Sequence, residues 1–64
     1  MTSLVTTPNI ADADGFYARL LATHRGLNEA QSHALNARLV LILANHVGDA
    51  AVLDAALALA RDQT

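Results

Sequence analysis

The feature that most limits how this chain can fold is an unbroken apolar run, residues 39–44, in the middle of a helical pattern. Six successive apolar residues occupy every side of a helix, because neighbouring side chains point about 100° apart around its axis. A helix that is apolar all round has to be covered on all sides. Because the chain has only 64 residues, few other elements remain to supply that cover.

The small size of the chain makes the covering harder. A domain of about 60 residues buries only about 60% of the surface of its unfolded chain, so a lone monomer is marginally stable. Disulfides, a metal or oligomerisation commonly compensate. The chain has no cysteine, which excludes disulfides and thiolate metal sites. Apolar residues make up 53% of it, but many are alanines, which favour helix strongly.

Charge and hydropathy exclude several classes of partner. The net charge is −2, with four basic residues, all arginine, against six acidic ones. Nucleic-acid binding needs several phosphate contacts from basic side chains, and anionic membranes also attract basic segments. The apolar run is far shorter than the roughly 20 residues that span a bilayer. Residues 1–8 have neither the basic start nor the apolar stretch of a signal peptide. We therefore expect a cytoplasmic protein of bacterial type, without nucleic-acid or membrane partners.

The hydrophobic periodicity predicts an all-α fold with helices at about residues 12–25, 29–47 and 50–61. Residues 1–8 are predicted to form a flexible N-terminal arm, and residues 9–64 a single helical domain. Connections of two or three residues place successive helices next to one another. The expected architecture is a three-helix up-down-up bundle with a long apolar central helix, or a central helix flanked by the other two.

Helix start and stop signals stand at the predicted boundaries. N-cap side chains accept hydrogen bonds from free N–H groups of the first turn, and glycine adopts the left-handed backbone that ends a helix. The N-cap candidates are Asn9 or Asp12, Asn28 and Asp49, and the terminating glycines are Gly26 and Gly48. Gln31, three residues after Asn28, completes the pattern of a capping box.

The apolar central helix leads to the prediction of a homodimer. The two flanking helices, one of them rich in alanine, are too few to surround residues 39–44, so a second copy related by a twofold axis is expected to cover the rest. The alternative is a compact monomer whose N-terminal arm fills the gap. The predicted interface residues are Leu39, Leu41, Ile42, Leu43, Leu53 and Leu57.

The sequence shows no pattern typical of catalysis or metal binding. His33 and His46 lie on different sides of one helix, and no ligand set completes a pair of His24 and His33. No nucleophile elbow is present, and the three glycines stand singly rather than in a phosphate-binding loop. We therefore predict no metal, no cofactor and no enzymatic activity.

One polar cluster has an alternative functional interpretation. Arg38 and Asn45 are seven residues apart, so they share one side of the central helix, and His46 adjoins them. In the structural interpretation Arg38 pairs with Asp49 or Asp54 and fixes the register of the helices. In the functional one the cluster of Arg38, Asn45 and His46 holds a small anionic ligand or a carboxylate of a partner, or forms an enzymatic site.

Three stretches of the chain resemble a known family. They are Pro-Asn-Ile-Ala-Asp at residues 8–12 with Phe16 and Tyr17, Leu-Asn-Ala-Arg-Leu at 35–39, and Leu-Ala-Asn-His-Val-Gly-Asp at 43–49. The chain is similar over residues 8–60 to short proteobacterial proteins of unknown function, the domain of unknown function 2783 family. The resemblance implies a stand-alone accessory protein, in some cases encoded beside flavin-dependent hydroxylases or other enzymes of aromatic-compound breakdown. It implies no catalytic residue.

The function predicted from the sequence is a small protein-interaction or accessory module that self-associates or docks on a partner enzyme. The alternative is a ligand-binding or enzymatic site on the cluster described above. A DNA-binding helix-turn-helix is disfavoured, because a recognition helix is usually basic and the third predicted helix offers only Arg61.

Overall fold

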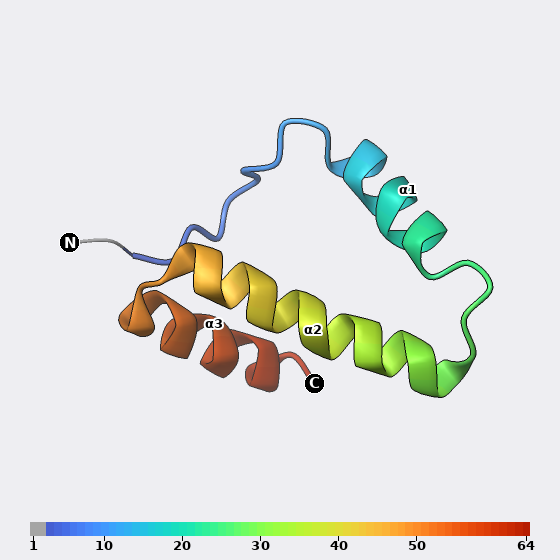
Figure 1. The fold of residues 1–64 in the computed structure, drawn as a ribbon. Helices are drawn as coiled ribbons and strands as arrows, with labels where there is room; N and C mark the ends of the chain where they lie inside the picture. The colour runs from blue at the N-terminus through green and yellow to red at the C-terminus, as the bar shows by residue number, and fades with distance from the viewer. Residues whose placement is uncertain (1–2) are drawn as a thin grey trace.

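The computed structural model describes residues 3–64, and in that part of the chain the fold is all-α. The three helices are α1 (Ala13–Thr23), α2 (Glu29–Val47) and α3 (Ala50–Asp62) (Figure 1). The predicted N-terminal arm begins with two residues that lie outside the described range. Of the apolar residues in the rest of the N-terminal segment, Leu4 is half-buried, whereas Val5 and Ile10 are exposed.

The predicted N-caps of the first two helices are confirmed. Asp12, not Asn9, caps α1, since its Oδ1 accepts a hydrogen bond from the Gly15 N–H at 3.0 Å. In the capping box of α2, the Gln31 N–H donates to Asn28 Oδ1 at 2.9 Å, and the Asn28 N–H donates to Gln31 Oε1 at 3.0 Å. Both caps satisfy backbone donors that have no partner within the helix itself.

A two-residue turn joins α2 to α3 and reverses the chain, so that the two helices form an antiparallel hairpin (Figure 1). Gly48 has the predicted left-handed backbone, with φ of 71°, and its N–H donates to Ala44 O. Asp49 then caps α3 as predicted, because its Oδ1 accepts from the N–H groups of Ala51 and Val52. The hairpin is thus fixed by local hydrogen bonds and by one glycine.

The first helix ends earlier than the predicted residue 25. The His24 N–H donates to Leu21 O, and the Arg25 N–H donates to Ala22 O, both at 3.1 Å. These bonds span three residues instead of four, which tightens the chain and ends the α-helix. Residues 24–28 therefore form a five-residue connection, longer than the two or three residues expected, and Gly26 in it has the predicted positive φ, at 82°.

The first helix, α1, does not pack on the hairpin, although a connection of five residues is within the range that joins packed helices. Among the described residues, close contacts between helices are confined to α2 and α3 (Figure 1). The radius of gyration of the Cα atoms is 13.5 Å, whereas a compact domain of this length has about 11 Å. The structure therefore shows three helices in an open arrangement, in which α1 does not pack as the third member of a bundle.

The open arrangement leaves residues 3–64 without a buried core. No residue in the described range is classed as buried. The accessible surface is 5658 Å², whereas a folded monomer of this mass exposes about 3,900 Å². The chain thus exposes an excess of about 1,700 Å², and most of its large apolar side chains contribute to it.

Candidate functional site

The apolar surface of α2 is divided between two hollows on different sides of the helix. The first, which we call the α2–α3 face, has a volume of about 450 Å³. Its lining residues come from both helices of the hairpin: Val40, Leu41, Leu43, Ala44, Val47, Leu53, Ala56 and Leu57. All of them are apolar, and Leu41 and Leu57 remain 70% and 66% exposed. Nothing within the described chain covers this face.

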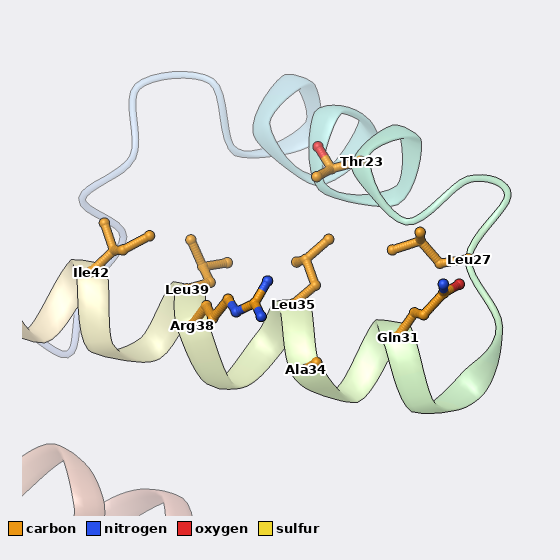
Figure 2. Close-up of a pocket in the computed structure, with 8 residues that line it drawn as sticks. All are labelled: Thr23, Leu27, Gln31, Ala34, Leu35, Arg38, Leu39 and Ile42. Atoms are coloured by element: carbon orange, nitrogen blue, oxygen red, sulfur yellow. The ribbon is translucent and has the colours of Figure 1, made fainter.

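The second hollow, the α1–α2 groove, lies on the side of α2 that is turned toward α1 (Figure 2). It has a volume of about 520 Å³, and its lining residues are Thr23, Leu27, Gln31, Ala34, Leu35, Arg38, Leu39 and Ile42. Leu35, Leu39 and Ile42 are spaced four and three residues apart and so form one stripe along α2. Unlike the α2–α3 face, this groove contains a charged residue, Arg38.

The six residues predicted as an interface divide between these two surfaces. Leu41, Leu43, Leu53 and Leu57 line the α2–α3 face. Leu39 and Ile42 line the α1–α2 groove instead. The sequence therefore identified apolar residues that line exposed hollows, but it did not separate them into two surfaces, because an all-apolar run carries no signal of which side each neighbouring helix takes.

The polar cluster considered above is not gathered in one cavity. Arg38 lines the α1–α2 groove, whereas Asn45 and His46 line neither this groove nor the α2–α3 face. The carboxylate of Asp49, one of the predicted partners of Arg38, accepts hydrogen bonds from the first turn of α3. Among the described residues, no side-chain hydrogen bond involves Arg38.

A polar contact that the sequence analysis missed joins the end of α1 to α2. His24 Nδ1 lies 2.9 Å from Ser32 Oγ, and His24 Nε2 lies 3.1 Å from Asn36 Oδ1. Because a carbonyl oxygen only accepts, Nε2 carries the proton given to Asn36. The sequence pattern that could have predicted this contact is the four-residue spacing of Ser32 and Asn36. This spacing places both residues on one side of α2, opposite the histidine that follows α1.

A serine, a histidine and an amide in line also occur in nucleophilic catalysis, so the surroundings decide what the contact does. Neither the α1–α2 groove nor the α2–α3 face is lined by His24, Ser32 or Asn36. We therefore interpret the three side chains as a clamp that sets the angle at which α1 leaves α2.

We expect His24→Ala to loosen this clamp. Each lost hydrogen bond contributes about 0.5–1.5 kcal/mol, and partial exposure places the sum near 1 kcal/mol. Amide hydrogen exchange in residues 20–28 should accelerate about fivefold, with little change in the α2–α3 hairpin. His33→Ala is the matched control, because no hydrogen bond to its side chain is present among the described residues. Equal exchange rates in both variants would show that the clamp does not hold α1.

Within residues 3–64, no three histidine or acidic side chains are grouped so that they could hold a metal ion. No helix in that range has both the length and the apolar character that crossing a bilayer requires.

Comparison with known proteins identifies a family. A family model described as a protein of unknown function, DUF2783, matches residues 4–62 and so covers nearly the whole chain. No curated protein and no solved structure matches the chain.

Proposed function

Since the chain belongs to the DUF2783 family, which is described as being of unknown function, we propose from its surface that it is a protein-interaction module that self-associates as a homodimer. The observation that carries this proposal is that no described residue is buried, while large apolar side chains are exposed on both sides of α2. Without a core of its own, the chain gains one by association. We assign it no catalytic step.

The size of the exposed surface agrees with an obligate dimer. The excess of about 1,700 Å² per chain, or about 3,400 Å² for two chains, is the upper limit of what such an interface can bury, because it also includes the surfaces of α1 and of the α1–α2 groove. Obligate homodimers bury about 2,000–5,000 Å², and their interfaces are apolar like a divided domain core. The chain therefore has the amount of surface that such a dimer requires.

The α2–α3 face is the surface that we assign to the dimer contact. A twofold interface pairs one patch with its own copy, so a charge at the centre of the patch would meet a like charge. The α2–α3 face has no charged or polar residue in its lining. Two antiparallel hairpins that meet through such faces form a four-helix bundle. The sequence predicted a homodimeric up-down-up bundle without saying which helices form the contact. In our proposal α2 and α3 supply the dimer core, and α1 lies outside it.

Sedimentation equilibrium tests the proposal directly. We expect a species of twice the chain mass of 6.7 kDa at micromolar concentration. Because folding and association are coupled, we also expect a melting temperature that rises with protein concentration. A single monomeric species with a melting temperature independent of concentration would contradict the homodimer.

A further inference from the structure

The α1–α2 groove differs from the α2–α3 face in one respect that determines what it can bind. Arg38 lies along the groove between Leu35 and Leu39, on the side of α2 turned toward α1 (Figure 2). It is exposed, and none of the side-chain hydrogen bonds among residues 3–64 involves it. The groove therefore combines an apolar floor with one cation that has no carboxylate bonded to it.

The position of this cation argues against an arrangement in which the same groove of a second copy faces this one. Arg38 falls near the middle of the α2 residues that line the groove, which run from Gln31 to Ile42. A twofold axis through the groove would bring the two Arg38 side chains toward each other, and like charges across an interface oppose association. The dimer contact that we assign to the α2–α3 face leaves this groove free.

The apolar stripe in the groove has the spacing that a helix recognises. Leu35, Leu39 and Ile42 repeat at the intervals of one helix face, and a helix lies in such a groove through its own apolar stripe. Only Thr23 of α1 and Leu27 of the connection line the other side. Within the described part of the chain, contacts between helices are confined to α2 and α3, so α1 does not itself fill the groove.

We propose that the α1–α2 groove binds an amphipathic helix of a different protein, and that a carboxylate on this helix pairs with Arg38. The apolar side chains of the partner helix pack on Leu35, Leu39 and Ile42. The glutamate or aspartate of the partner helix accepts hydrogen bonds from the guanidinium N–H groups of Arg38. A guanidinium favours a carboxylate because the geometry of its N–H groups matches the two carboxylate oxygens. This proposal concerns a surface separate from the dimer contact and extends the function to the recognition of a second protein.

The probe for this proposal is a set of three synthetic peptides. Each is a 16-residue amphipathic helix with one leucine stripe, and they differ only in one residue beside the stripe, which is Glu, Gln or Lys. Binding to the full chain is measured by fluorescence anisotropy of a label on the peptide. We expect the Glu peptide to bind about tenfold more tightly than the Gln peptide, as is typical of a charge-assisted hydrogen bond. The Lys peptide should bind most weakly.

Variants of the protein connect this preference to one side chain. Arg38→Gln should abolish the difference between the Glu and Gln peptides, and Arg38→Glu should make the Lys peptide the tightest of the three. Arg61→Gln is the matched control: it removes the same charge from the last turn of α3, outside the groove, and should leave the tenfold preference unchanged. Peptides that do not bind, or a Glu preference that survives in Arg38→Gln, would overturn the proposal.

The same samples separate this proposal from the proposed dimer. Arg38→Gln should leave the sedimenting mass unchanged, because Arg38 lies outside the α2–α3 face. Leu39→Asn should weaken binding of all three peptides at least tenfold at that same mass, because it places an unpaired polar group on the floor of the groove. If the protein is a monomer that still prefers the Glu peptide, the homodimer proposal fails and the helix-binding proposal stands. If it is a dimer without this preference, the helix-binding proposal fails and the homodimer proposal stands.

Discussion

Leu57→Asp is expected to dissociate the proposed dimer and to unfold much of the chain with it. Leu57 lies on the α2–α3 face and is 66% exposed in the single chain. Burying a leucine contributes about 2 kcal/mol, and a twofold interface contains the residue twice. Losing about 4 kcal/mol raises the dissociation constant about a thousandfold, and burying a carboxylate without a partner opposes association further. Sedimentation measures the mass, and circular dichroism at the same concentration measures the helix content.

Two other variants make this result interpretable. Ala58→Asp adds the same charge one residue further along α3, about 100° around the helix and outside the α2–α3 face. It should leave the mass unchanged. Leu57→Ala is a milder change that keeps the helix propensity high. It should weaken association by a smaller factor while the chain still folds at high concentration. If Leu57→Asp sediments as a dimer over the same concentration range as the parent chain, the α2–α3 face is not the contact.

The parts of the fold that the sequence predicts well are those set within a few residues. The capping box needs only Asn28 and Gln31, three positions apart, because each side chain reaches the backbone of the other. Gly48 and Asp49 likewise end one helix and begin the next through contacts within four residues. Such signals depend on local geometry alone, so they hold whatever the helices later pack against.

The placement of α1 is the part that local patterns could not predict. Short connections favour packed neighbouring helices. Here the hydrogen bonds that span three residues end the helix at Thr23, so five residues separate α1 from α2. His24, which follows α1, then contacts Ser32 and Asn36, eight and twelve residues away, and we interpret this contact as setting the direction in which α1 leaves. The hydrophobic stripe of α1 identifies which side of the helix is apolar, but not whether another helix of the same chain covers it.

The candidate site was predicted only in part for a similar reason. Helical spacing places Arg38 and Asn45 within about 20° of each other around α2, which is why they were grouped. Seven residues also separate them by about 10 Å along the axis, and the groove extends from Gln31 only to Ile42. Angular position could be derived from the sequence, whereas the length of the groove depends on where α1 and its connection lie. Arg38 is consequently the member of the cluster that lines the groove.

Gly48→Val is expected to destabilise the hairpin formed by α2 and α3. At φ of 71° the backbone is left-handed, a conformation that costs residues with a Cβ about 1–2 kcal/mol and is still less favourable for β-branched residues. We expect the free energy of unfolding to fall by about 2 kcal/mol and the melting temperature to fall by about 10 °C at fixed protein concentration. Thermal denaturation followed by circular dichroism measures both changes.

The cause of this loss should be the backbone and not crowding, because the nearest atom to an added Cβ at Gly48 is Asn45 O, at 3.8 Å. Gly48→Asn tests this, since asparagine fills more space than alanine but tolerates the left-handed region, and it should lose less than half as much stability. Gly26→Val introduces the same strain at φ of 82° with no atom within 4 Å. We expect a smaller loss there, because a five-residue connection can redistribute its dihedral angles, whereas the two-residue turn at Gly48 and Asp49 has to reverse the chain. Equal losses at the two glycines would show that α2 and α3 do not depend on the tight turn for their pairing.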